Sequence, residues 1–250
     1  MLRVQEVDRV RVLTLDRPER LNAFSEELYL RLTSELVRAS DDDGTAVVLL
    51  TGSGRAFSAG ADLEELGRRS AGTGPTTTAF DSLVDSLAAF PKPIVAAVNG
   101  LAVGFGATLL GLVDLVVMSS AARVKYPFTE LGLSPEAGGS FTLPALVGRH
   151  EATWALLSSE WLTAAACLDI GLAWRVVEPD ELVEEAMRFA AVIGARPIGS
   201  LVATKRLIAA ASADALAQAR RREDASIGRL LGGPENRAAL AALSARSASA

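Results

Sequence analysis

The sequence predicts an α/β fold, in which buried strands alternate with helices before the chain becomes mainly helical. Residues 46–50 and 94–98 are almost continuous aliphatic runs, as expected for parallel strands that are covered on both faces. A glycine-rich junction follows each run, at residues 51–63 and 99–106, and a helical pattern separates the two units. The strands are expected in the first part of the chain, and the last third is expected to be helical.

The other elements follow from local patterns. Residues 4–15 alternate as in a β-hairpin, and residues 17–23 are expected to form a loop. Ser25 is a candidate N-cap for a helix that continues to about Ala39, and the Gly/Ser/Thr-rich residues 67–78 are the best candidate for a mobile segment. Further strands are expected at residues 112–118 and 175–177, with short elements in a loop at 121–133. Further helices are expected at residues 76–90, 180–193, 198–231 and 234–243, and in interrupted form over 138–174.

Composition excludes several classes of protein. The chain has 250 residues, half of them hydrophobic, which is enough for one large domain. No uninterrupted apolar run of roughly 18 residues predicts a membrane span, and we expect no secretory leader. A single cysteine, Cys167, excludes an intramolecular disulfide and favours a reducing compartment, so we expect the protein in the cytoplasm. A net charge of −5 argues against a nucleic-acid partner.

The glycine motifs do not match those of nucleotide-binding enzymes. The segment from Gly104 to Gly106 has Leu109 where the dinucleotide-binding motif requires a third glycine. Gly54 is likewise followed by Phe57 at that position, and no phosphate-binding loop with the Gly-Lys-Ser/Thr ending occurs. The sequence therefore gives no support to nucleotide hydrolysis or hydride transfer.

Serine, cysteine and metal chemistry are also disfavoured. Ser58 lacks the first glycine of the nucleophile motif of serine hydrolases, and the only histidine, His150, is expected at the surface or at a helix end. Cys167 lies on an apolar helical pattern and is expected in the core. No cluster of histidines, cysteines and carboxylates has metal-ligand spacing.

The two glycine junctions and one glutamate remain as candidates for chemistry. Two backbone N–H groups, one from each junction, could hold an oxygen atom as it gains negative charge. Glu136 lies between Pro135 and Ala137 in an apolar stretch just before a helix, where burial would raise its pKa toward that of a general base. Two alternatives stay open: the glycines only permit close packing, and Glu136 only pairs with the free N–H groups of the helix start.

Four stretches then point to a known family. They are RLNAFS at residues 20–25, GRAFSAGADL at 54–63, VNGLAVGFG at 98–106 and LGLSPEAGG at 131–139. In this order and at this spacing they resemble the signatures of the enoyl-CoA hydratase/isomerase (crotonase) superfamily, over nearly the whole chain. The resemblance implies a crotonase-like spiral core of ββα turns with a C-terminal helical region, and an acyl-CoA thioester as substrate.

The resemblance also implies a site. The N–H groups of Ala61 and Phe105 would form the oxyanion hole, and coenzyme A would pass along residues 20–23 and 59–63. No cofactor is expected beyond the coenzyme A of the substrate. The substrate-binding residues implied in this way are Arg20, Ala23, Ala59, Gly60, Ala61, Asp62, Leu63 and Phe105.

Departures from the family pattern bear on the reaction. Thr108 and Phe128 stand where family hydratases place their two catalytic glutamates, whereas Glu136 stands where several isomerases place a single acidic base. Residues 127–136 resemble the corresponding phrase of peroxisomal-type Δ3,Δ2-enoyl-CoA isomerases. We therefore expect an isomerase with Glu136 as the base and Glu130 as the reserve candidate. The alternatives are an enoyl-CoA hydratase, an epoxyphenylacetyl-CoA-type isomerase and a non-catalytic acyl-CoA binder.

The resemblance further implies an assembly. We expect a core domain over residues 1–195, a helical trimerisation region over 196–250, and a homotrimer or dimer of trimers. The segment after Gly232 departs from the common family ending, which leaves open whether a neighbouring subunit contacts the coenzyme. No membrane partner is expected.

Overall fold

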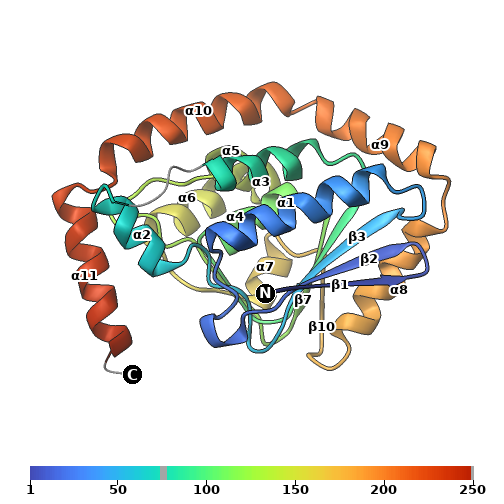
Figure 1. The fold of residues 1–250 in the computed structure, drawn as a ribbon, viewed down its shortest axis with the longest axis horizontal. Helices are drawn as coiled ribbons and strands as arrows, with labels where there is room; N and C mark the ends of the chain where they lie inside the picture. The colour runs from blue at the N-terminus through green and yellow to red at the C-terminus, as the bar shows by residue number, and fades with distance from the viewer. Residues whose placement is uncertain (74–77, 249–250) are drawn as a thin grey trace.

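The computed structural model describes residues 1–73 and 78–248 and confirms the α/β fold (Figure 1). The larger sheet is parallel except for the N-terminal hairpin, in which β1 pairs antiparallel with β2. Its strands, in spatial order, are β1 (Leu2–Val7), β2 (Val10–Leu15), β3 (Val47–Gly52), β5 (Ile94–Val98), β7 (Leu115–Ser119) and β10 (Arg175–Val177).

A second, smaller sheet consists of strands of two or three residues. They are β4 (Ala56–Ser58), β6 (Leu101–Val103), β8 (Arg123–Lys125) and β9 (Leu162–Thr163), in that spatial order. Each of β3, β5 and β7 therefore continues into a short strand of the second sheet, which gives the repeated ββ step of a spiral. The sequence predicts these regions only as junctions, loops or interrupted helix, because strands this short carry no recognisable alternation.

Helices cover both faces of the larger sheet. Helix α1 (Glu26–Asp41) begins at the expected N-cap, where the Ser25 hydroxyl accepts a hydrogen bond from the Leu28 N–H. It packs with α3 (Thr78–Ala89) on one face, and α8 (Leu182–Gly194) covers the other. Burial on both faces explains why the central strands are aliphatic throughout.

The remaining helices lie between the strands and in the C-terminal part of the chain. They are η1 (Pro18–Arg20), α2 (Leu63–Ser70), α4 (Phe105–Thr108), η2 (Leu109–Leu112), α5 (Gly139–Val147), α6 (Arg149–Ser158), α7 (Ala164–Asp169), α9 (Ile198–Ala210), α10 (Ala213–Leu230) and α11 (Pro234–Ala248). In Figure 1, α10 spans the top of the molecule and α11 descends at one end beside α2.

Several boundaries differ from those expected; α11, for example, continues to Ala248 rather than ending at residue 243. The segment 198–231 is two helices rather than one, because the chain turns at Ser212, whose carbonyl accepts from Leu216 to start the second helix. Strand β7 begins at Leu115 rather than residue 112, because Leu112 ends the short helix η2. Within the expected mobile segment 67–78, residues 67–70 belong to α2, and residues 74–77 lie outside the described residues.

The C-terminal segment is tied to its own chain by one buried amide. Asn236, fully buried near the start of α11, accepts hydrogen bonds from the Ser70 hydroxyl (2.9 Å) and from the Gly232 N–H (3.0 Å). Its side-chain nitrogen donates to the Leu131 carbonyl at 2.8 Å. These bonds join the end of α2, the start of α11 and the loop before Glu136.

Among the described residues, no single helix is long and apolar enough to cross a membrane. The pair α8 and α9 meets the length and composition criteria together, but it is bent by 103°.

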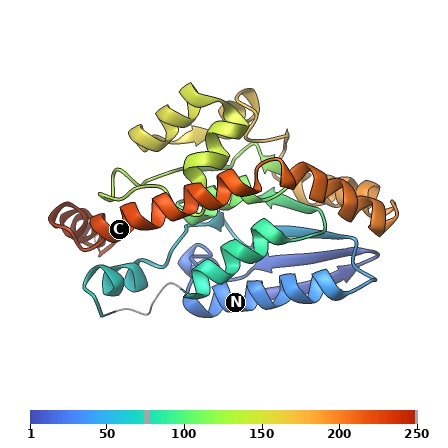
Figure 2. The same ribbon diagram turned by 90° about the horizontal axis from the view of Figure 1, so that it is seen from above.

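Exposed apolar side chains on α6 predict that this helix adds a contact between subunits, beside the expected trimerisation region over residues 196–250, in the homotrimer or dimer of trimers that the resemblance implies. This helix belongs to the group that lies on the side of the molecule away from α1 (Figure 2). Trp154 is 58% exposed and Leu157 is 65% exposed, and burial of such side chains between subunits is favourable. Multi-angle light scattering should report a trimer or hexamer, and Trp154→Glu should raise the monomer fraction. Val37→Glu, at an exposed position on α1, is the control and should change nothing. A parent protein that is monomeric at micromolar concentration contradicts the prediction.

Candidate active site

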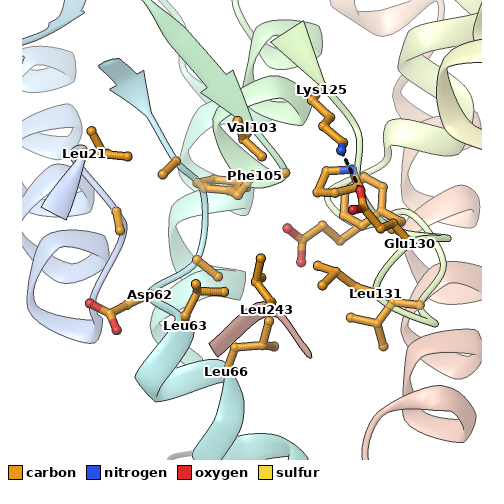
Figure 3. Close-up of a pocket in the computed structure, with 18 of the residues that line it drawn as sticks. Leu21, Asp62, Leu63, Leu66, Val103, Phe105, Lys125, Glu130, Leu131 and Leu243 are labelled. Carbon is orange, nitrogen blue, oxygen red and sulfur yellow. Dashed lines mark ion pairs between the residues drawn. The ribbon is translucent and has the colours of Figure 1, made fainter. Parts of the chain in front are cut away.

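One cavity of about 760 Å³ brings together nearly all the site residues expected from the sequence (Figure 3). Its wall comes from the 19–23 loop, α1, the 59–66 segment, the start of α4, the 125–136 loop and the C-terminal helices. Of the expected residues it contains Arg20, Ala23, Ala59, Ala61, Asp62, Leu63, Phe105 and Glu136. Gly60 is buried behind this wall rather than part of it.

The two glycine junctions meet at Gly60. Its φ is +83°, and a Cβ atom there would lie only 2.5 Å from the Val103 carbonyl oxygen and 3.1 Å from the Phe105 nitrogen. A side chain at residue 60 would therefore push the two junctions apart. The packing alternative for the glycines is thus correct at this position, and the same close packing sets Ala61 beside Phe105.

The N–H groups of Ala61 and Phe105 are both unpaired among the described residues. Phe24 forms a bridge to this segment by donating to the Gly60 carbonyl (2.7 Å) and accepting from Asp62 (3.0 Å), and this leaves the N–H of Ala61 outside the bridge. Phe105 is the first residue of α4, where a helix has no internal acceptor for its N–H groups. Both residues line the cavity, so two free donors are available to a bound oxygen atom.

Glu136 also lines the cavity, and its carboxylate has no hydrogen-bond or ion-pair partner within residues 1–73 and 78–248. Burial raises the pKa of Glu136 to about 7. Arg69 opposes this rise, whereas the negative charges of Glu223 and Asp81 add to it. A carboxyl group with this pKa is suited to exchange protons near neutral pH.

Three other carboxylates of the cavity wall are paired. Asp62 is the N-cap of α2 and accepts a hydrogen bond from the Glu64 N–H at 3.1 Å. The Glu64 carboxylate forms an ion pair with Arg20 at 3.0 Å. Glu130, the reserve candidate for the base, is paired with Lys125 at 2.5 Å (Figure 3). These pairs distinguish the three carboxylates from Glu136.

Glu223 performs the helix-start role that was the alternative interpretation of Glu136. From α10, its carboxylate accepts hydrogen bonds from the N–H groups of Gly138 and Ser140, both at 2.7 Å, and it is only 4% exposed. The carboxylate of Glu136 is therefore not needed to satisfy α5. Nothing in the sequence indicates this contact, because Glu223 follows a run of arginines typical of an exposed helix.

The two positions of the family's hydratase glutamates are close to the cavity and carry no acid. Thr108 is 2% exposed, and its hydroxyl donates to the carbonyls of Gly104 and Phe105 at 3.3 Å. Phe128 is part of the cavity wall and is 5% exposed.

The disfavoured chemistries remain without support from geometry. The Ser58 hydroxyl is bound into the backbone, donating to the Asn22 carbonyl (2.9 Å) and accepting from the Gly60 N–H (3.1 Å). His150 is exposed on α6, and Cys167 is fully buried in the core, as expected. In the described part of the chain, no group of three or more His, Cys, Asp or Glu side chains could hold a metal ion.

The fold and the cavity with its two free N–H donors define a class of protein. Comparison of the sequence with known families identifies that class. The chain belongs to the enoyl-CoA hydratase/isomerase family, whose model matches residues 5–231. It is 37% identical to the 1,2-epoxyphenylacetyl-CoA isomerase of Escherichia coli (strain K12) over 83% of this chain and 81% of that protein. It is also 37% identical to the 2,3-dehydroadipyl-CoA hydratase of the same organism, over 82% and 80% of the two chains.

A solved structure confirms the fold. An enoyl-CoA hydratase/isomerase from Pseudoalteromonas atlantica superposes with a TM-score of 0.92 at 36% identity, covering 98% of this chain and 97% of that one. The expected superfamily and crotonase fold are therefore confirmed. The relatives include both isomerases and hydratases, so the family alone leaves the reaction open.

The contact between Glu223 and the start of α5 predicts a large effect on stability. Glu223→Ala should lower the free energy of unfolding by about 2–4 kcal/mol, because the buried N–H of Gly138 and the partly buried N–H of Ser140 lose a charged acceptor. Glu184→Ala, at an exposed position on α8, is the control and should stay within about 0.5 kcal/mol of the parent. Urea denaturation followed by circular dichroism measures both. Equal, small changes in the two variants would show that the contact contributes nothing.

Proposed function

We propose that the protein is an acyl-CoA isomerase that shifts a double bond through a coenzyme A enolate, with Glu136 as its single base. The observation that carries the proposal is the unpaired carboxylate of Glu136 in the same cavity as the two free N–H groups. The apolar wall around them supports a substrate with a hydrocarbon acyl group.

In the proposed reaction, the N–H groups of Ala61 and Phe105 bind the thioester oxygen. Glu136 removes a proton from the α-carbon, and the electron pair moves into an enolate whose oxygen the two donors stabilise. The protonated Glu136 then returns the proton to the γ-carbon, so the double bond moves from the 3,4 to the 2,3 position. The reaction moves one proton from the α-carbon to the γ-carbon. The thioester and the ionised Glu136 are regenerated unchanged.

The coenzyme A part of the substrate is assigned to the wall formed by residues 20–23 and 59–63. Backbone at Ala59 and Ala61 and the side chain of Arg20 are available there. Arg20 is exposed and pairs with Glu64 at 3.0 Å, so it can reorient toward a phosphate at little cost.

Two other reactions of the family are the alternatives. Similarity to the 1,2-epoxyphenylacetyl-CoA isomerase favours a second isomerisation, of an epoxide-bearing acyl-CoA, with the same base and oxyanion donors. Hydration is disfavoured because Thr108 and Phe128 cannot activate water or protonate the α-carbon, which leaves one carboxylate for both tasks.

The experiment that tests the proposal compares two substrates. We expect conversion of trans-3-hexenoyl-CoA to 2-hexenoyl-CoA to be much faster than hydration of 2-hexenoyl-CoA, followed by absorbance and product mass. Rapid hydration without any double-bond shift would overturn the isomerase assignment. Failure to turn over either substrate, together with tight binding of both, would favour the epoxide reaction or a non-catalytic binder.

Ala61→Pro tests the oxyanion hole. Proline removes the N–H donor, and loss of one such donor costs about 10²–10³ in kcat. Ala121→Gly, at an exposed position outside the cavity wall, is the control because it changes a side chain and keeps the N–H. Circular dichroism must show that the proline variant is folded. A folded Ala61→Pro protein with the parent kcat would exclude this N–H as a donor.

Glu136→Gln tests the base. The amide keeps the shape of the side chain but cannot take a proton, so the rate should fall by roughly 10²–10⁴ with little change in substrate binding. Glu130→Gln is the matched control, since that carboxylate is paired with Lys125. The reverse result, with Glu130→Gln inactive and Glu136→Gln active, would assign the base to Glu130.

The raised pKa of the Glu136 carboxyl group predicts how the activity of the parent enzyme depends on pH. Because burial raises the pKa of Glu136 to about 7, kcat/KM should rise with pH as the carboxyl loses its proton and should level off above that value. A profile without an inflection between about pH 6 and 8 would exclude a base with this pKa.

A further inference from the structure

The chain has two tyrosines, and their hydroxyl groups differ. Tyr126 is buried in the core, with its hydroxyl 3.5 Å from the Ala107 carbonyl oxygen. Tyr29, on α1, lines the cavity and is only 7% exposed, yet its hydroxyl has no hydrogen-bond partner among the described residues. The hydroxyl oxygen is open to the cavity rather than enclosed by protein, so it is free to donate a hydrogen bond to an atom of a bound ligand.

Aromatic packing holds the ring of Tyr29 in place. It stacks on Phe24 at 5.0 Å between centroids and contacts Phe80 and Phe105, both at 5.6 Å. A ring confined on these sides cannot rotate away from the cavity without breaking contacts worth about 0.5–1.5 kcal/mol each. The hydroxyl is therefore presented from a fixed position next to Phe105, whose N–H is one of the free donors.

The charged groups around Tyr29 affect which kind of ligand atom can accept a hydrogen bond from its hydroxyl. Burial raises the pKa of Tyr29 well above its ordinary value, and the negative charges of Glu136, Glu65 and Asp62 add to the effect, opposed by Arg69. The phenol thus stays protonated and acts as a hydrogen-bond donor. The charges that act on the hydroxyl are mostly negative, which disfavours a carboxylate as its partner and favours a neutral acceptor.

The cavity wall contains many apolar side chains, among them Leu66, Leu131 and Ile227. Among the described residues, neither Ser134 nor Glu136 of the same wall accepts a hydrogen bond from Tyr29. A fixed donor in a largely apolar wall can select a polar feature of the ligand.

We infer that Tyr29 donates a hydrogen bond to a neutral oxygen atom carried by the acyl group, and that the site prefers acyl-CoA thioesters bearing a hydroxyl, ether or keto oxygen. This inference rests on the proposed function, because it takes acyl-CoA to be the ligand of the cavity. It goes further by defining the class of acyl group.

Calorimetry with inert ligands tests the inference. Hexanoyl-CoA, 4-hydroxyhexanoyl-CoA, 5-hydroxyhexanoyl-CoA and adipyl-CoA are titrated into the parent, Tyr29→Phe and Tyr126→Phe proteins. One or both hydroxy ligands should bind the parent about three- to tenfold more tightly than hexanoyl-CoA, as expected for one hydrogen bond. Tyr29→Phe keeps the ring contacts and should abolish this advantage, whereas Tyr126→Phe should retain it.

The possible failures are distinguishable. If hexanoyl-CoA binds and neither hydroxy ligand binds more tightly, or if the advantage survives in Tyr29→Phe, the role of Tyr29 is wrong and the proposed function stands. Preferential binding of adipyl-CoA would replace the neutral oxygen with a carboxylate and overturn the inference. Absence of binding by all four thioesters would overturn the proposed function and this inference together.

Discussion

The site depends on one close backbone contact, the approach of Gly60 to the Val103 carbonyl. A Cβ atom at residue 60 would lie 2.5 Å from that oxygen, so only glycine allows the two junctions to meet. This contact sets the free N–H groups of Ala61 and Phe105 at the same wall of the cavity. The two-sheet spiral makes this contact possible, because β3, β5 and β7 each continue into a short strand of the second sheet. Two donors from different parts of the chain thereby become one candidate site for an oxygen atom.

A second constraint concerns carboxylates. Helix α5 begins beside the cavity, and its exposed N–H groups attract a negative charge. Glu223 satisfies them from α10. The Glu136 carboxylate therefore has no partner among the described residues, and burial raises its pKa to about 7. Had Glu136 accepted these bonds, its charged form would have been stabilised and its pKa lowered. The C-terminal helices thus affect the chemistry of a residue more than eighty positions away.

Much of the fold could be predicted from local pattern. The aliphatic runs at β3 and β5, the Ser25 cap of α1, and the breaks between α8 and α9 and between α10 and α11 all follow from side-chain chemistry near each position. The short strands of the second sheet could not be predicted, because two or three residues define no period. The turn at Ser212 was likewise missed, since the residues on both sides favour helix.

The sequence by itself determined which groups could carry chemistry: the glycine junctions, Glu136, and the absence of acids at Thr108 and Phe128. These conclusions depend only on which residue type occupies a position and on its neighbours in the chain. Only the tertiary structure decided that Glu136 is unpaired, that Glu130 is bound to Lys125, and that the hydroxyl of Tyr29 is left open to the cavity while that of Tyr126 is paired. Pairing is decided by groups that are distant in sequence, and local pattern carries no information about them.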